Sequence, residues 1–474
     1  MPTNGILEKV EKLVEGEIMA LAKEPPDKYP FTDLGNAERL KAAYGDILRY
    51  NHAEGHWLIW NGTIWEKDND KEIFNLVQLQ ARELYKQAAT IEDKKFKEIT
   101  QKWARKSESY GSIRSTARIA RGLRGIASNG KGWDDKPWLF ACKNGVIDLK
   151  TGELRAGDPK DLMTMRSSIE YKQQEISEWK KFLNDIADGN EELIYYIKKC
   201  VGYMLVGIAP EKAIFMCYGW TGNNGKSTFI DILKYIMGDY WQEAADKVFE
   251  FHKNETQTND LVKLRNKRLV TYEETGDAML FNEKNAKRLS GYQTTINARG
   301  LHKESITFNP VCKIWMSFNQ KPKIRDQSPA FWKRINMIHF KKTFDPSKNQ
   351  DIGERLKKET SGILLWAIEG CLDWQREGIK DKPACVIEAT KEYENASYPL
   401  QDWIEECCIE GVNEKGDQKN AYLSYKKWFA EQGDSKYVMG VKAFSTLIDT
   451  RYQRKKSHGT RMIYGLSIKE IPWV

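Results

Sequence analysis

One stretch decides the fold predicted from this sequence: Tyr218-Gly219-Trp220-Thr221-Gly222-Asn223-Asn224-Gly225-Lys226-Ser227-Thr228. The apolar run Ala213-Ile214-Phe215-Met216-Cys217 precedes it and predicts a buried strand, and Phe229-Ile230-Asp231-Ile232-Leu233 follows and predicts a helix. A glycine-rich loop between strand and helix, ending in Lys-Ser, is typical of a phosphate-binding loop. Glycines allow successive backbone N–H groups to face a phosphate, and the helix N-terminus adds partial positive charge.

Each residue type in this loop has an expected task. We expect Lys226 to reach the terminal phosphates of a nucleotide and the Ser227 hydroxyl to hold Mg²⁺. Trp220 stands where the first glycine of the usual spacing is expected, and Gly219 lies one residue earlier. We interpret this as a variant loop, although a glycine-rich surface turn is the alternative. The predicted nucleotide contacts are Gly222, Asn223, Asn224, Gly225, Lys226, Ser227 and Thr228.

The composition describes a globular chain of several domains. With 474 residues, 41% of them hydrophobic and 30% charged, we expect about two to four domains. No run approaches the length of a membrane span, and the N-terminus lacks the plan of a secretory signal, so we expect a cytoplasmic protein with no membrane partner. The net charge of +8 and the pI near 8.8 favour a polyanionic partner only modestly. The eight cysteines form no C-x-x-C pair, which predicts neither a zinc site nor a disulfide framework.

The N-terminal third alternates between helical patterns and hairpins. We expect an arm over residues 1–30 and a helix from Asn36. His56–Glu66 alternates around Asn61-Gly62, which predicts a hairpin. From Lys71 to about Ser128 the pattern is helical and highly charged. It includes a cluster of four arginines, Arg114, Arg118, Arg121 and Arg124. Spacings of three and four residues place much of this cluster on one helix face. The face is predicted to be either solvated or in contact with nucleic acid or a neighbouring subunit.

Three segments resemble, in this order, the N-terminal region of phage and plasmid primase–helicases: Phe31–Leu40, Trp57–Trp65 and Asn144–Leu149. Those proteins are superfamily 3 helicases, together with poxvirus-type relatives, and the similarity continues through the phosphate-binding loop to the C-terminus. The resemblance implies an α/β fold with an AAA+-like P-loop ATPase core, a mixed α+β N-terminal domain and a C-terminal winged-helix domain. It also implies ATP and Mg²⁺ as cofactors.

A second element carries an acidic pair after an apolar strand, Arg268-Leu269-Val270-Thr271-Tyr272-Glu273-Glu274. In an open α/β sheet the carboxyl ends of the strands meet where ligands bind. Carboxylates there can bind Mg²⁺ and orient the attacking water, and the pair resembles the second ATPase motif of the family. We assign the metal to Glu273 and water activation to Glu274, with the reverse assignment open.

The next segments supply the remaining catalytic candidates. Lys313–Asn319 predicts a strand ending in an amide, and we expect Asn319 to contact the γ-phosphate or align the lytic water, as an Asn does in the family. Trp332–Ile335 resembles the family's arginine-finger segment. A guanidinium suits charge spread over phosphoryl oxygens, so Arg334 is our candidate and Arg325 the alternative. Such a finger acts from a neighbouring subunit, which implies a ring.

Two hairpins with basic tips predict contacts with DNA. Ile296–Phe308 resembles the family's hairpin that enters the central channel and grips the DNA backbone, which needs cations at a projecting tip and no base specificity. Near the C-terminus, predicted helices and a basic hairpin suggest a winged helix that places one helix in the major groove and the wing on phosphates. Solvated turns are the alternative for both. The predicted DNA contacts are Arg299, His302, Lys303, Lys442, Arg454, Lys455, Lys456 and Arg461.

The sequence therefore predicts an ATP-dependent replicative DNA helicase of a phage, plasmid or mobile element, acting in the host cytoplasm. The resemblance implies a hexameric ring that moves 3′ to 5′ on single-stranded DNA and binds forked DNA. One alternative is a primase–helicase component that needs a separate primase or polymerase, because we find neither a strand-end Asp-x-Asp pair combined with a distant His nor a zinc knuckle. Another is a DNA-binding initiator or scaffold with a vestigial ATPase. The predicted domains are 1–30 (arm), 31–176 (α+β), 177–345 (ATPase), 346–380 (helical lid) and 381–474 (winged helix).

Overall fold

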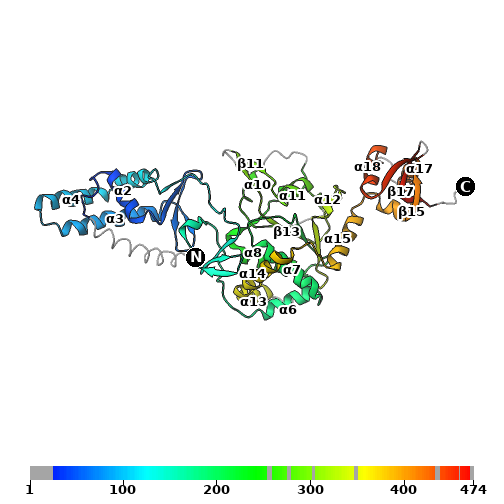
Figure 1. Ribbon diagram of the computed structural model, residues 1–474, viewed down its shortest axis with the longest axis horizontal. Coiled ribbons are helices and arrows are strands. Elements are labelled where there is room, and N and C mark those ends of the chain that lie inside the picture. Colours follow the sequence, from blue (N-terminus) through cyan, green and yellow to red (C-terminus); the bar gives the residue numbers. More distant parts are fainter. Residues whose placement is uncertain are drawn as a thin grey trace.

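The computed structural model describes residues 25–252, 259–274, 279–300, 305–345, 351–432, 438–457 and 460–469. The molecule is elongated, and an N-terminal region, a central region and a C-terminal region follow one another along it (Figure 1). The architecture is mixed α/β around a parallel sheet, which confirms the predicted class at that level. No helix in these ranges is long and apolar enough to cross a bilayer.

The N-terminal region packs helices against a four-stranded sheet of order β3-β2-β1-β4. The hairpin predicted around Asn61-Gly62 is confirmed, since Trp60 pairs with Trp65 across it. Strand β4 is parallel to β1. The elements are α2 (Asp33–Tyr44), β1 (Leu48–Asn51), β2 (His56–Trp60), β3 (Trp65–Asp68), α3 (Glu72–Ala89), α4 (Lys94–Ser107), α5 (Tyr110–Ala120) and β4 (Ala127–Ser128).

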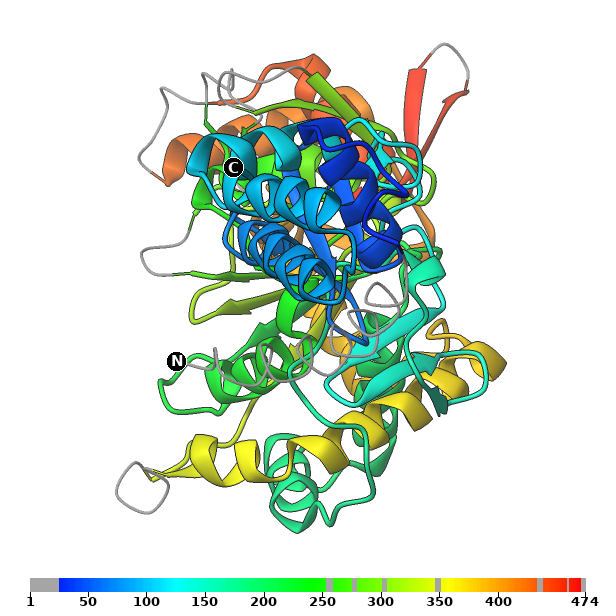
Figure 2. The same cartoon turned by 90° about the vertical axis from the view of Figure 1, so that its left-hand side faces the viewer.

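Capping residues set where these helices begin. The Thr32 hydroxyl accepts from Gly35 N at 3.0 Å, so α2 starts earlier than predicted from its apolar pattern. The long charged pattern after Lys71 forms three helices because Asp93 and Ser109 each cap a new one. Seen from the N-terminal end, these helices stand in front of the core (Figure 2).

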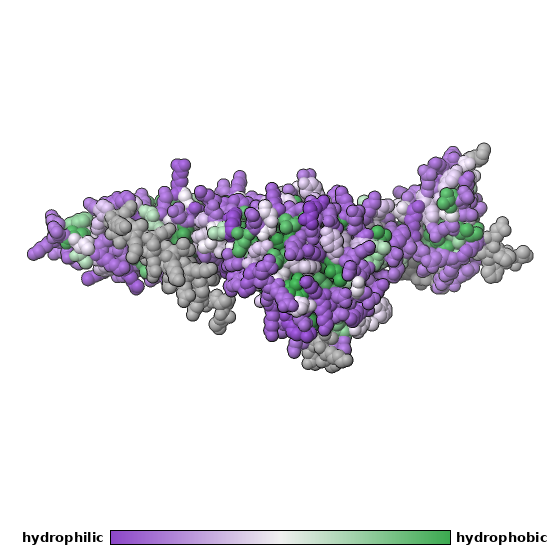
Figure 3. Space-filling model, turned by 60° about the horizontal axis from the view of Figure 1, so that its bottom comes forward, coloured by the Kyte–Doolittle hydropathy of each residue, from purple (hydrophilic) through white to green (hydrophobic). Residues whose placement is uncertain are grey.

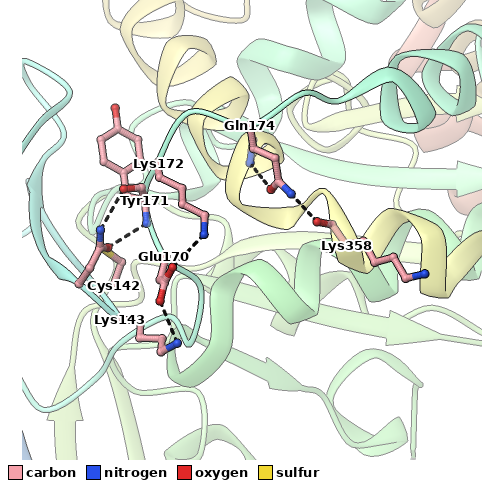
Figure 4. Close-up of polar contacts among 9 residues, drawn as sticks. Cys142, Lys143, Glu170, Tyr171, Lys172, Gln174 and Lys358 are labelled. Carbon is pink, nitrogen blue, oxygen red and sulfur yellow. Dashed lines mark hydrogen bonds and ion pairs between the residues drawn. The ribbon is translucent and has the colours of Figure 1, made fainter.

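A second small sheet joins the N-terminal region to the core. It contains β5 (Leu139–Cys142), β6 (Gly145–Asp148) and β7 (Glu153–Arg155), and Asp148 pairs with Glu153 across the turn between β6 and β7. Apolar residues of β5 and β6 pack into a hydrophobic cluster of the central region. A strap of residues 170–174 ties this sheet to the helices beyond it: Glu170 pairs with Lys143 at 2.9 Å, and Gln174 donates to the Lys358 carbonyl at 2.6 Å (Figure 4).

The central region is built on a five-stranded sheet of order β14-β8-β13-β10-β9 in which all neighbours are parallel. Four of the strands, β8, β10, β13 and β14, are almost fully buried, as expected when helices cover both faces, whereas the edge strand β9 is partly exposed. They are β8 (Ile214–Tyr218), β9 (Trp241–Glu243), β10 (Leu269–Glu273), β13 (Lys313–Phe318) and β14 (Ile335–His339). An antiparallel hairpin, β11 (Ile296–Arg299) and β12 (Ser305–Phe308), is inserted before β13.

Helices surround this sheet, and the buried apolar residues of helices and sheet form two hydrophobic clusters. Trp179 stacks on Phe229 and meets Trp366 edge to face, so three helices share one aromatic cluster. The helices are α6 (Ser177–Ile186), α7 (Glu191–Met204), α8 (Lys226–Met237), α9 (Asp246–Phe249), α10 (Asn259–Val262), α11 (Glu283–Leu289), α12 (Pro329–Trp332), α13 (Ile352–Lys358), α14 (Thr360–Glu377) and α15 (Ala384–Ala396).

The C-terminal region has its own core around Trp403, Tyr425 and Phe444. Its antiparallel sheet has the order β15-β17-β16. The predicted helices and basic hairpin are present, while β15 was not predicted. The elements are α16 (Gln401–Cys407), β15 (Cys408–Asp417), α17 (Gln418–Glu431), α18 (Val441–Arg451), β16 (Gln453–Ser457) and β17 (Thr460–Ile468). The molecular face in Figure 3 is mainly hydrophilic, with small apolar patches.

Candidate nucleotide site and nucleic-acid contacts

The loop between β8 and α8 holds a buried cation at the start of a helix. Gly225 precedes the helix with φ of 84°, and a Cβ there would lie 3.0 Å from the Phe344 ring. The Lys226 ammonium donates to the Gly219 carbonyl at 3.0 Å and to Asn224 Oδ1 at 3.2 Å. Burial lowers its pKa, and within the described ranges no carboxylate forms an ion pair with it. A buried ammonium with neutral partners suits an incoming anion.

The unusual spacing at Trp220 has a geometric explanation. A Cβ at Gly219 would lie 2.9 Å from the Asn224 side chain and 2.9 Å from the Phe340 carbonyl. The tight approach that requires glycine therefore falls one residue earlier than in the usual spacing. The Trp220 side chain is 70% exposed, so its bulk does not disturb the loop.

A segment that sequence reasoning missed, residues 340–344, holds this loop from the side of β14. Asn224 Nδ2 donates to Thr221 Oγ1 and to the Lys342 carbonyl, both at 3.1 Å. The hydroxyls of Thr221 and Thr343 share a hydrogen bond of 2.7 Å. No motif marks this segment, because most of its contacts use backbone groups that any residue provides.

The parallel register brings the predicted catalytic residues to one edge of the sheet. Glu273 at the end of β10 lies opposite Ser317 of β13, and Phe318 lies opposite Tyr218 at the end of β8. Glu274 N donates to the Ser317 carbonyl at 3.1 Å. The acidic pair, the end of β13 and the phosphate-binding loop therefore occupy neighbouring positions, as their chain order predicted.

The two carboxylates at this edge have different surroundings. Glu273 forms an ion pair with Lys234 of α8, and its side chain is 25% exposed. Glu274 Oε1 is buried without a hydrogen-bond partner among the described residues, and its Oε2 lies 3.5 Å from Gln320 N. Burial raises the pKa of the Glu274 carboxyl. A carboxyl with an unsatisfied oxygen and a raised pKa suits a proton acceptor.

The remaining polar candidates lie on the same rim. Ser227 is exposed on the first turn of α8, and Thr228 after it is half-buried. Asn319 is exposed and directly follows β13. Hydroxyl and carboxylate oxygens are ligands that Mg²⁺ prefers, so the side chains of Ser227 and the acidic pair fit such an ion by their chemistry.

Both candidate arginine fingers are engaged within the chain. Arg334 directly precedes β14, so it lies at the sheet edge opposite the phosphate-binding loop, and its guanidinium donates to the Ser290 carbonyl at 3.2 Å. Burial lowers its pKa. Arg325 lies 3.7 Å from a Glu283 oxygen and stacks over the Phe251 ring at 3.8 Å. Arg334 therefore lies away from the phosphate-binding loop of its own chain.

The hairpin β11–β12 is present as predicted, but its tip lies outside the described residues. Arg299 pairs with Ser305 across the hairpin, and its side chain is exposed. His302 and Lys303, which were also predicted to contact DNA, lie outside the residues that the structure describes. The hairpin leads into β13 and therefore joins the sheet at the edge opposite the phosphate-binding loop.

The C-terminal hairpin presents most, but not all, of its predicted cations to solvent. Lys455, Lys456 and Arg461 are exposed on β16 and β17, and Lys442 is exposed on α18. Arg454 differs, because its guanidinium bonds both carboxylate oxygens of Asp449 and donates to Gln418 Oε1 at 2.8 Å. It therefore ties the hairpin to α17 and α18.

Two family models match the chain. One is described as D5 N terminal like and matches residues 37–188; the other, a family of unknown function (DUF5906), matches residues 217–334. Among solved structures, the chain is similar to the C-terminal region of NrS-1, with 11% identity and a TM-score of 0.44 over 88% of this chain and 96% of that chain.

Curated relatives are viral proteins. "Putative helicase L207/L206" of Acanthamoeba polyphaga mimivirus is 24% identical over 62% of this chain and 33% of its own length. "Putative helicase 184R" of Invertebrate iridescent virus 6 is 25% identical over 71% of this chain and 39% of its own length. The chain thus spans between a third and two fifths of the length of these relatives.

Proposed function

Since this chain is of the phage and viral primase–helicase type, we propose that it is an ATP-dependent replicative DNA helicase of a phage, plasmid or mobile element. It forms a hexameric ring, encircles one strand of forked DNA and moves 3′ to 5′ by hydrolysing ATP. Its core is a P-loop ATPase of the superfamily 3, AAA+-like class. Relatives named as helicases support the helicase part of this proposal.

The alignment of the strand ends carries the proposal. Lys226 at the phosphate-binding loop, Asn319 after β13 and Glu274 after β10 come from three adjacent parallel strands and meet at one edge. These three residues are far apart in the sequence, so the fold and not local chain geometry brings them together. A buried cation, an amide and a carboxyl with raised pKa are the groups that phosphoryl transfer to water requires.

Each residue has one task in the proposed reaction. The loop from Gly222 to Thr228 binds the phosphates, with Lys226 on the terminal ones. Ser227 and Glu273 would hold Mg²⁺, which neutralises phosphate charge when bound. Glu274 accepts the proton of the attacking water, and Asn319 orients that water or the γ-phosphate. Arg334 reaches the nucleotide of the neighbouring subunit, and Arg325 remains the alternative.

The ring arrangement assigns DNA to two surfaces. The hairpin β11–β12, with Arg299, grips the strand in the channel, and the C-terminal unit reads the duplex as a winged helix. We propose the domain division 31–176, 177–345, 346–380 and 381–474. If the chain is instead the helicase component of a primase–helicase, a separate primase or polymerase would synthesise the primers.

The scaffold alternative predicts a nonfunctional nucleotide site. The irregular spacing at Trp220 would favour such a site, but the solvent position of that side chain, with Gly219 at the tight contact, favours a working loop instead. Hydrolysis of ATP stimulated by DNA distinguishes the two functions, because a scaffold would lack it.

The deciding experiment is unwinding of a forked duplex with ATP and Mg²⁺, beside the variant Lys226→Ala. We expect strand separation by the native chain and none by the variant, with fork binding retained in both. A native chain that binds the fork but neither unwinds it nor hydrolyses ATP would overturn the proposal in favour of the scaffold.

A further inference from the structure

A cavity of about 630 Å³ opens in the N-terminal region, where β1 and β4 end side by side. The backbone closes its base, because His52 N donates to the Ser128 carbonyl at 2.9 Å. Its volume lies within the range of sites that hold small organic groups. None of its lining residues belongs to the candidate nucleotide site.

A guanidinium and an indole ring, those of Arg49 and Trp133, line one wall, and the buried Trp65 ring packs against both. The Arg49 guanidinium lies over the Trp65 ring at 4.8 Å and donates to the Leu48 carbonyl at 2.7 Å. Trp133 meets Trp65 edge to face, and its Nε1 donates to the Ser128 hydroxyl at 2.9 Å. These contacts fix flat side chains before any ligand arrives, which lowers the entropic cost of binding.

A short loop, residues 128–133, shapes the opposite side. Gly130 has φ of 78°, and a Cβ there would lie 2.7 Å from the Ala53 Cβ, so the loop passes closer to the turn after β1 than another residue permits. Asn129 is exposed at the rim, and its Oδ1 accepts from Lys131 N at 3.1 Å. The rim therefore carries an amide and an exposed lysine.

The arginine cluster noted in the sequence continues from this cavity. His52 Nε2 lies 2.9 Å from the Arg121 carbonyl, which connects the cavity wall to the residue after α5. The Arg121 guanidinium covers the Tyr50 ring at 4.6 Å. Arg118 and Arg114 are exposed on α5, one helical turn apart, or roughly 6 Å along the axis. Asp70, 3.5 Å from Arg121, is the one carboxylate paired with these arginines among the described residues.

We propose that this cavity and the adjoining arginines form a second binding site for single-stranded DNA, separate from the central sheet. One base enters the cavity beside Arg49 and Trp133, because bases stack on aromatic and guanidinium planes. The following phosphates lie along Arg118 and Arg114, since phosphate contact requires exposed cations and no base specificity. The choice of DNA rests on the proposed function, but the site requires no ATP hydrolysis.

Photo-crosslinking of the full chain, without nucleotide, tests this site directly. The probe is a short oligo-dT in which single thymidines are replaced by 5-iododeoxyuridine. We expect crosslinked peptides that contain His52 or Trp133, and we expect the same peptides from Lys226→Ala. Failure of the helicase proposal would therefore leave this result intact. Crosslinks confined to the β11–β12 and β16–β17 hairpins would overturn the site.

Charge reversal provides the matched measurement. Arg118→Glu should weaken oligo-dT binding about three- to tenfold at about 100 mM salt and flatten its salt dependence. Lys102→Glu is the control, since Lys102 is exposed on α4, which lies at the end of the molecule away from the core (Figure 1).

Asn129→Ala tests the rim without removing a buried group. Equal affinities for Arg118→Glu and Lys102→Glu would overturn the site. An altered assembly mass with unchanged binding per subunit would also overturn it, because the arginines would then be a subunit contact.

Discussion

The edge of the central sheet and the C-terminal hairpin both carry groups assigned to phosphates, yet they are built differently. At the sheet edge, Lys226 is 6% exposed and held by Gly219 and Asn224. On the hairpin, Lys455 and Lys456 extend into solvent from β16. One region fixes a desolvated cation in place, and the other displays solvated cations on a surface.

This difference determines how much a single side chain contributes. A buried charge acts in a low-dielectric site, where its interaction with a phosphate is much stronger than in water. An exposed cation is screened by salt and contributes through the release of counterions. Substitutions at the sheet edge should therefore abolish activity, while those on the hairpin should change affinity gradually.

The largest effect is expected for Lys226→Ala. Loss of this buried ammonium should lower ATP hydrolysis about 1,000-fold, because the positive charge that it places on the terminal phosphates is removed. Steady-state phosphate release in the presence of oligo-dT measures the effect. Lys181→Ala, on the exposed side of α6, is the control and should leave the rate unchanged. A comparable loss in both variants would indicate a general defect rather than a phosphate contact.

The second comparison separates the two carboxylates of the acidic pair. Glu274→Gln should lower hydrolysis about 100-fold while ATP binding persists, since the amide cannot accept a proton from water. Glu273→Gln should instead raise the Mg²⁺ concentration needed for activity and release Lys234. Magnesium titrations of both variants measure this. A Mg²⁺ defect confined to Glu274→Gln would reverse the two assignments.

The pH dependence of hydrolysis sharpens the assignment of Glu274. Burial raises the pKa of this carboxyl, and only its ionised form accepts a proton. As the pH falls through the raised pKa, activity should therefore disappear at a higher pH than an ordinary glutamate would give. Rates measured from about pH 5 to pH 8 report this acid limb. The same limb in Glu274→Gln would assign it to another group.

Much of the site was predictable because chain order and strand periodicity determine which strand ends meet. Lys226, Asn319 and the acidic pair each follow an apolar run, and a parallel sheet brings such ends to one edge. Residues 340–344 were not predictable, since they hold the loop through backbone groups. Strand β15 was also missed, because most of its residues are exposed and polar, and its register shifts between Glu410 and Lys415.

The smallest effects are expected on the C-terminal hairpin, where two neighbouring cations should separate structure from DNA contact. Lys456→Ala should leave stability within about 0.5 kcal/mol and reduce the salt slope of DNA binding by about 1, because one exposed phosphate contact is lost. Arg454→Ala should lower the free energy of unfolding by about 1 kcal/mol, because Asp449 and Gln418 lose their partner. Thermal melting and anisotropy titrations at several salt concentrations measure the two effects. If Arg454→Ala changed the salt slope and left the melting temperature unchanged, the Arg454 guanidinium would bind DNA rather than stabilise the hairpin. The distinction between cations that are fixed by contacts within the protein and cations that are exposed to solvent would then fail at this residue.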